Sequence, residues 1–233
     1  MTLEELLQPH PFGGGNPHLW GLKYDVEDER FLRIFGDFAR LISRSEKACE
    51  KTTEQTDPDY QQFVAEAEGD YLEELIGASF IVLQTKIRRV TSSALVFYKA
   101  MLAEHQIDIR ELSCTTQIHK IGGERYKRKQ ASLVKLIWDV GNYYKHRDEW
   151  PDEVWRKKRA SEKKKLSVTT CRSVQRVGIV QFSTGNMLKA YQFFDIYPYS
   201  KCKQLADKVQ WWADQVYQTA VESLKRSVLA QGG

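Results

Sequence analysis

The segment FIVLQTKIRRVTSSALVFYKAM, residues 80–101, carries the most regular pattern in this sequence of 233 residues. Its apolar residues recur three and four positions apart: Phe80, Leu83, Ile87, Val90, Ala94, Phe97 and Met101. This spacing predicts a helix face that packs against other helices, whereas a strand needs a period of two. Asp57 and Pro58 suit the N-cap and the first position of a helix. We therefore predict a helix from Pro58 to about His105, either continuous or else broken or bent near Gly69 or Gly77.

Apolar periodicity predicts three further long helices, at residues 25–55, 131–150 and 200–229. Residues 166–199 fit either two short strands or a short helix, and the helical interpretation is preferred. Residues 1–24, with glycines between two prolines, predict an arm or loop. The predicted fold is all-α: an up-and-down bundle of about four long helices in a single domain over residues 25–233, with a short α or β embellishment at 166–199.

The composition is that of an ordinary globular protein, with 42% hydrophobic and 28% charged residues. No apolar run approaches the roughly 20 residues that span a bilayer, and the acidic N-terminus lacks the pattern of a signal peptide. The four cysteines are scattered and form no CxxC pair, which favours reduced thiols over a disulfide scaffold or zinc site. We therefore expect a cytoplasmic protein with no membrane association, metal or cofactor.

Charge is distributed unevenly along the chain. Residues 25–76 contain 15 Asp/Glu against 6 Lys/Arg, and residues 110–165 contain 16 Lys/Arg against 8 Asp/Glu. This separation predicts either an anionic partner at the basic half or pairing of the two halves, within one chain or between copies. Four cations form a candidate phosphate-binding cluster: Arg125, Lys127, Arg128 and Lys129.

The helix predicted at 131–150 separates into two stripes at 100° per residue. The apolar stripe consists of Leu133, Leu136, Ile137, Val140 and Tyr144, and the polar stripe of Lys135, Asp139, Asn142, His146 and Glu149. One interpretation is a solvated face with a surface histidine near a helix C-terminus. The other is an RNA site, because histidine titrates near neutrality, an amide can orient a ligand, and Lys145 and Arg147 offer cations for phosphate.

The run Asn142-Tyr143-Tyr144-Lys145-His146 near the end of a bundle helix resembles the signature of the HEPN superfamily. The members of this superfamily are small helical-bundle proteins of prokaryotic toxin–antitoxin, phage-defence and related systems, and many are metal-independent RNases. The family pattern is an arginine, a polar residue that is often asparagine, three variable residues and a histidine. Asn142 and His146 match the last two conserved positions, whereas Gly141 occupies the position of the arginine.

The resemblance implies that His146 transfers the proton when a 2′-hydroxyl attacks the adjacent phosphate, with Asn142 assisting, in a cleft shared by two subunits. The missing arginine would have to be replaced by Arg147, Lys145, Arg88 or Arg89. Two hypotheses follow: an RNA-directed protein, acting as endoribonuclease or silent RNA binder, and a non-enzymatic helical interaction subunit of a defence or regulatory complex. The expected partners are RNA, a second copy, or a partner protein of a defence system.

A run of acidic residues offers no better metal site: Glu66, Glu68, Asp70, Glu73 and Glu74. No histidine accompanies them at a helical i, i+3 spacing, so a di-iron site of the bundle type is not supported. An acidic, solvated helix face is the preferred interpretation.

Overall fold

The computed structural model describes residues 3–8, 10, 15–52, 57–123, 132–156, 165–181 and 183–231. These residues form α-helices, short 3-10 helices and turns, with no β-strand among them, which confirms the all-α prediction. Within the same ranges, no helix combines the length and the hydrophobicity needed to cross a membrane.

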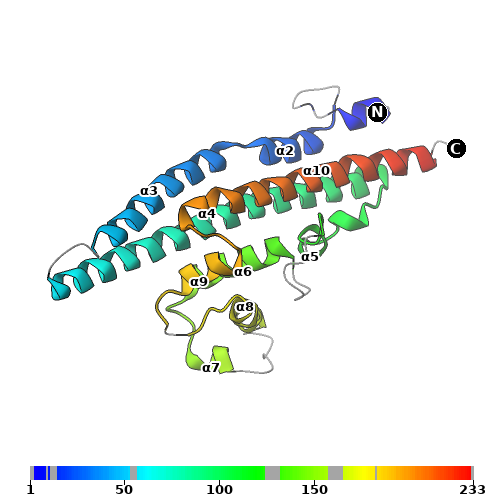
Figure 1. Ribbon diagram of the computed structural model, residues 1–233. Helices are drawn as coiled ribbons and strands as arrows, with labels where there is room; N and C mark the ends of the chain where they lie inside the picture. The colour runs from blue at the N-terminus through cyan, green and yellow to red at the C-terminus, as the bar shows by residue number, and fades with distance from the viewer. Residues whose placement is uncertain are drawn as a thin grey trace. The chain divides into compact units, whose positions relative to one another are not determined.

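The elements follow one another along the chain, and Figure 1 labels α2 to α10. They are α1 (Leu3–Leu7), α2 (Pro17–Glu27), α3 (Arg30–Thr52), α4 (Pro58–His105), η1 (Arg110–Leu112), α5 (Thr115–Ile118), α6 (Leu133–His146), α7 (Asp152–Arg156), α8 (Lys165–Gln175), α9 (Asn186–Phe193), η3 (Tyr199–Cys202) and α10 (Lys203–Gln231).

The long helix α4 confirms the prediction from residues 80–101. It is continuous through its glycines, and Asp57 caps its N-terminus by accepting a hydrogen bond from the Asp59 N–H at 3.0 Å. All seven apolar residues of the quoted pattern are buried. The helix predicted at 25–55 is instead two helices, α2 and α3, and α2 already begins within the segment that we expected to be an arm or loop. Asn16 caps α2 by accepting hydrogen bonds from two backbone N–H groups.

The chain divides into two compact units. Unit 1 comprises Met1–Glu29, Thr85–Lys135 and Lys208–Gly233, and unit 2 comprises Arg30–Gln84 and Leu136–Asp207. The range 25–233, predicted as a single domain, includes parts of both units.

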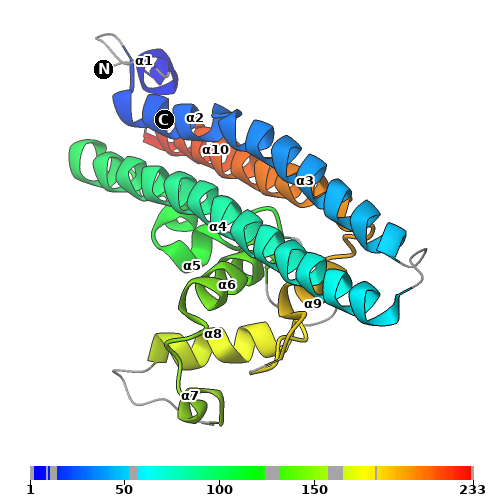
Figure 2. The same ribbon diagram turned by 90° about the vertical axis from the view of Figure 1, so that its left-hand side faces the viewer.

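In unit 1 a buried lysine closes the C-terminal end of α2. The Lys86 ammonium donates hydrogen bonds to the carbonyl oxygens of Asp25 at 2.7 Å, Val26 at 2.8 Å and Asp28 at 3.2 Å. A cation suits this position because the last carbonyls of a helix lack intrahelical partners and carry partial negative charge. Arg89, on the next turn of α4, pairs with the carboxylates of Asp25 and Asp28 at 2.6 Å each. α10 lies along α2 in both ribbon views (Figures 1 and 2), and the Gln210 amide donates to the Val26 carbonyl.

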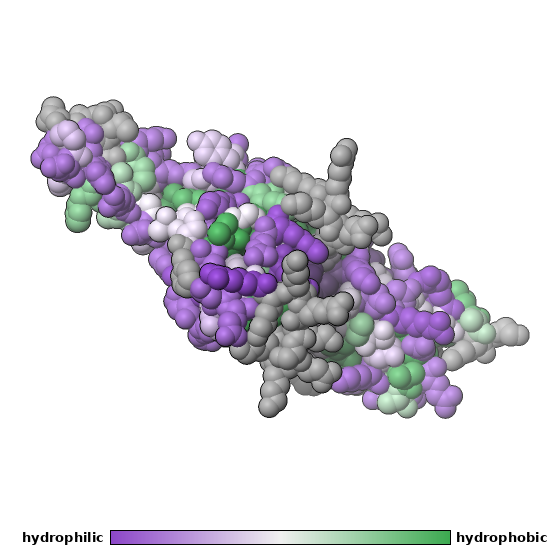
Figure 3. Space-filling model, turned by 90° about the horizontal axis from the view of Figure 1, so that it is seen from below, coloured by the Kyte–Doolittle hydropathy of each residue, from purple (hydrophilic) through white to green (hydrophobic). Residues whose placement is uncertain are grey.

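In unit 2, α3 runs beside the first part of α4, to which it is joined by the hydrogen bond from Ser45 to the Glu68 carboxylate. α8 and α9 provide the helical form of the embellishment, and the strand alternative for residues 166–199 is not found in the described part of that segment. A small apolar cluster joins α7 to α8 through Val154, Val168 and Cys171. On the face of the molecule seen in Figure 3, hydrophilic residues predominate and hydrophobic ones form small separate patches.

Candidate functional site

α6 is buried over most of its circumference. Its predicted apolar residues are at most 4% exposed: Leu133, Leu136, Ile137 and Val140. Tyr144 is half-buried. The prediction for the opposite stripe is wrong at Asp139, which is only 1% exposed. A helical wheel with one apolar stripe assumes that only one side of the helix is packed against the protein, whereas the middle of α6 is packed on several sides.

Two glycines allow α6 to approach α4 within unit 2. A Cβ atom on Gly77 would lie 2.0 Å from the Tyr144 ring, which no packing can accommodate. A Cβ atom on Gly141 would lie 3.1 Å from the Gln84 Cβ and 3.2 Å from the Phe80 carbonyl oxygen, which is also tight. Gly141 therefore faces α4 at the position where the HEPN pattern has its arginine.

The Asn142 side chain is held by the same helix contact. The Gln84 amide donates a hydrogen bond to the Asn142 Oδ1 at 2.7 Å and to the Trp138 carbonyl at 3.1 Å. Asn142 is only partly exposed. Because its carbonyl oxygen already accepts from Gln84, this amide serves packing between two helices.

His146 lies at the C-terminal end of α6, with its side chain 43% exposed. Its Nδ1 is 3.0 Å from the Glu149 carboxylate, and its ring stacks on Trp150 with the centroids 6.2 Å apart. When Nδ1 donates to Glu149, Nε2 is the unprotonated nitrogen and can accept a proton. The imidazole is thus oriented by a carboxylate and an aromatic ring.

Arg147 is bound to α4 rather than directed at a ligand. Its guanidinium lies 2.6 Å from the Glu74 carboxylate and 4.6 Å from the centre of the Tyr144 ring. Tyr144 also hydrogen-bonds Glu74. Burial would raise the pKa of Glu74, but the hydrogen bonds from Tyr144 and Arg147 outweigh burial and lower the pKa of this carboxyl. Burial and the neighbouring Glu74 raise the pKa of Tyr144 to about 12.

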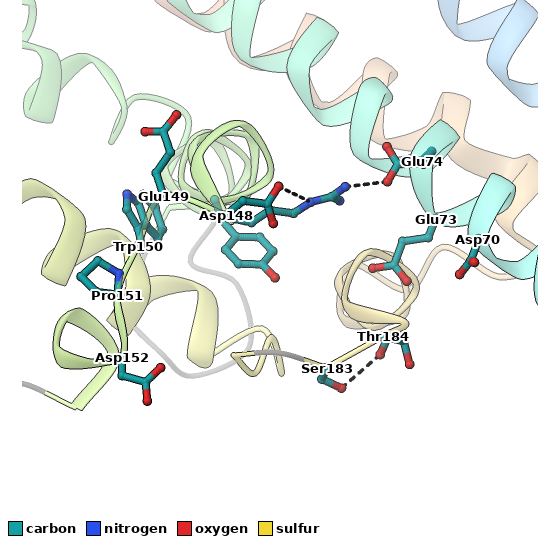
Figure 4. Close-up of a pocket in the computed structure, with 12 residues that line it drawn as sticks. Asp70, Glu73, Glu74, Asp148, Glu149, Trp150, Pro151, Asp152, Ser183 and Thr184 are labelled. Carbon is teal, nitrogen blue, oxygen red and sulfur yellow. Dashed lines mark hydrogen bonds and ion pairs between the residues drawn. The ribbon is translucent and has the colours of Figure 1, made fainter.

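A groove of about 880 Å³ opens beside these residues in unit 2 (Figure 4). α4 lines it with Asp70, Glu73 and Glu74, and the turn before α9 lines it with Ser183 and Thr184. The end of α6 and the segment that follows contribute Tyr143, Arg147, Asp148, Glu149, Trp150, Pro151 and Asp152. Six carboxylates and a single guanidinium therefore line the groove, which makes it acidic. The Asp148 carboxylate lies 4.0 Å from the Arg147 Nε, whereas the Glu149 carboxylate points away from the groove in Figure 4.

The acidic residues of α4, for which we predicted a solvated face, have individual contacts that the sequence did not indicate. Glu73 accepts a hydrogen bond from the Gly185 N–H, and Glu74 pairs with Arg147. Asp152 accepts from the Gln181 amide at 2.6 Å. Asp70 is exposed. Residues 70, 73 and 74 are three and four positions apart, which indicates that they lie on the same side of a helix. This spacing does not indicate which other segments of the chain they contact.

The structure describes only some of the remaining predicted site residues. The cluster Arg125, Lys127, Arg128 and Lys129 lies outside the described residues. Lys145 is exposed, and so is Arg88. Arg89 is engaged in unit 1 by Asp25 and Asp28.

In the described part of the chain, no three His, Cys, Asp or Glu side chains come together as metal ligands. Comparison with protein-family models, with curated proteins and with solved structures finds no match to this chain.

Proposed function

We propose that this protein is a helical interaction subunit of a regulatory or defence complex, which binds a positively charged partner protein at the groove of unit 2. The observation that carries the proposal is the excess of acidic groups at the groove: five carboxylates besides that of Glu149, which points away, against one guanidinium. Complementary charge steers association and selects the partner. RNA would bring phosphates to the same surface, where like charges repel.

The side chains that an RNase would use support the same proposal. Asn142 is bonded to Gln84, and Arg147 is bonded to Glu74. Recruiting either side chain for a phosphate would break a contact between α6 and α4. Both residues are therefore better suited to holding the groove together than to binding a nucleic acid.

The test is binding of a fluorescently labelled oligolysine peptide, measured by anisotropy over a range of salt concentrations. Asp70→Lys and Asp148→Lys reverse two exposed charges of the groove. The double variant should bind the peptide about tenfold more weakly, because each exposed ion pair contributes up to about 1 kcal/mol. Asp207→Lys is the matched control: it makes the same change at an exposed carboxylate of unit 2 that does not line the groove.

An equal loss of affinity in Asp207→Lys would mean that only net charge matters, and the proposal would fail. Absence of oligolysine binding at low salt would also refute it. Oligoglutamate is the negative control, because an acidic groove should not bind it at any salt concentration.

A specific observation favours a second candidate, the RNA-directed function implied by the HEPN resemblance. His146 is half-exposed and oriented through Nδ1 by Glu149, so that Nε2 could exchange a proton with a 2′-hydroxyl. This candidate predicts RNA cleavage that persists in EDTA and leaves a cyclic phosphate. His146→Ala should abolish cleavage without loss of fold, and Asn142→Ala should weaken it less. A wild type that cleaves no RNA would leave only the interaction function.

A further inference from the structure

An exposed aromatic stripe runs along the N-terminal part of α4. Tyr60 is 51% exposed, Phe63 69% and Tyr71 47%, and Ala67 between them is exposed as well. Their spacing of three, four and four residues places them within an arc of about 80° on one side of the helix. These four residues define the aromatic stripe.

The stripe faces away from the contact between α4 and α3. Glu68, which bonds Ser45 of α3, points about 100° from the centre of the stripe. The apolar residues Leu72 and Leu75 are buried on that same side, at 5% and 8% exposure. The stripe is therefore not needed to hold α3 and α4 together. Contiguous exposed apolar residues of this kind mark interaction surfaces, where tyrosine and phenylalanine are enriched.

The acidic groove borders the stripe along the same helix. Asp70 and Glu74 line the groove. Asp70 lies about 60° from the centre of the stripe, and Glu74 lies within the arc of the stripe, about one turn beyond its last residue. A ligand that covers the stripe and extends past its C-terminal end therefore also reaches carboxylates.

We propose that the segment bound here is an amphipathic, basic helix of a partner protein. Its apolar residues would pack along the aromatic stripe, and its lysines or arginines would face the carboxylates of the groove. This inference rests on the proposed function and specifies the form of the partner. Helices recognised in this way anchor through apolar residues three and four positions apart. The stripe extends over twelve residues of α4, about 16 Å from the first to the last, so about three turns of partner helix would cover it.

Charge selects this occupant over a membrane surface. An amphipathic helix that binds membranes carries cations beside its apolar face, because biological membrane surfaces are anionic. Here the apolar face is bordered by Asp70 and Glu74, which an anionic lipid surface would repel. A partner with apolar and cationic faces satisfies both parts of the surface.

The experiment uses two labelled synthetic peptides of leucine and lysine with identical composition, each about four helical turns long. One has its leucines on a single helical face, and the other has a scrambled order with no such face. The full-length protein should bind the amphipathic peptide at least tenfold more tightly. Phe63→Ser should lower the affinity for the amphipathic peptide about tenfold, because burial of one large apolar side chain contributes about that much. It should leave the affinity for the scrambled peptide unchanged.

Ile34→Ser is the matched control, since Ile34 is an exposed apolar residue of α3 outside the stripe, at 43% exposure. It should leave both affinities unchanged, and circular dichroism should show that both variants remain helical.

Three results would overturn the inference. In the first, the two peptides bind with equal affinity, Asp70→Lys lowers that affinity and Phe63→Ser does not change it. The partner is then cationic but not an amphipathic helix, and only the proposed function survives. If neither peptide binds at low salt, the proposed function fails as well. If sedimentation shows a wild-type dimer that Phe63→Ser dissociates, a second copy covers the stripe.

Discussion

Gly141→Arg would restore the arginine of the HEPN pattern at the position where this chain has glycine, and we expect it to destabilise the protein rather than to create activity. The reason is the contact between α6 and α4. A Cβ atom at this position would already lie 3.1 Å from the Gln84 Cβ and 3.2 Å from the Phe80 carbonyl oxygen. The longer arginine side chain would have to leave through this contact, so it would displace Gln84 from Asn142.

The expected cost has three parts. Overpacking of a close helix contact costs about 1–3 kcal/mol. A guanidinium enclosed there without a carboxylate partner adds about 1–3 kcal/mol. Loss of the hydrogen bond between Gln84 and Asn142 adds about 1–3 kcal/mol more. We therefore expect Gly141→Arg to lower the free energy of unfolding by at least about 3 kcal/mol, a large part of the total for an ordinary domain.

The assay is urea denaturation followed by circular dichroism, with Gly141→Ala as the control. Alanine stabilises the helix by up to about 1 kcal/mol through its higher propensity, and the tight contacts of its Cβ atom cost a similar amount. The Gly141→Ala protein should therefore be about as stable as wild type. A Gly141→Arg protein as stable as wild type would show that α6 does not approach α4 closely at this position. If that variant also cleaved RNA, the arginine would reach the histidine after all.

Three further predictions concern the core. Leu136→Asp should cost several kcal/mol in urea unfolding, because it places a charge where the wild-type side chain is 1% exposed; a loss below about 0.5 kcal/mol would contradict the assigned packing. Lys86→Met should cost about 2–4 kcal/mol, because three carbonyl oxygens at the end of α2 lose their donor, and an unchanged unfolding midpoint would argue against this cap. His119 is buried, and burial together with the charge of Lys135 lowers its pKa from 6.5 to about 4. The neutral form of His119 therefore stabilises the fold fully above about pH 6.5. The free energy of unfolding should fall by about 2 kcal/mol on acidification from about pH 7 to pH 5, because the unfolded chain then binds a proton that the folded chain does not. His119→Gln should abolish this pH dependence.

Apolar periodicity was sufficient for the long helices and failed where a tertiary contact sets a boundary. The helix predicted at 25–55 is interrupted at Asp28, whose backbone is extended, with φ −67° and ψ 96°. The carbonyls that end α2 there are satisfied by Lys86, about 60 residues further along the chain. No local pattern indicates that a distant lysine will provide the cap, so residues 25–55 resemble one continuous amphipathic helix.

The site was harder to predict than the helices because α6 is enclosed on several sides. The wheel separated one apolar stripe from one polar stripe, and this was correct for Leu136 and Val140 but not for Asp139. The contact between Gly77 and Tyr144 is equally invisible in the sequence, since the two residues are remote in the chain and either could occur in an unrelated helix. Only the packing of α6 on α4 gives these residues their roles.

The groove also shows why the charge of a stretch does not give the electrostatic potential at a site within it. Residues 110–165 carry an excess of cations, from which we predicted either an anionic partner or pairing with the acidic half. Nine of the sixteen cations of that stretch lie at 124–131 and 157–164, outside the described residues. The part that lines the groove instead contributes Asp148, Glu149 and Asp152, which lie opposite the acidic residues of α4. Because exposed charges are screened beyond about 8–10 Å, a ligand in the groove senses these nearby carboxylates more strongly than the average of the stretch. The local geometry therefore favours a cation where the sequence average favoured phosphate.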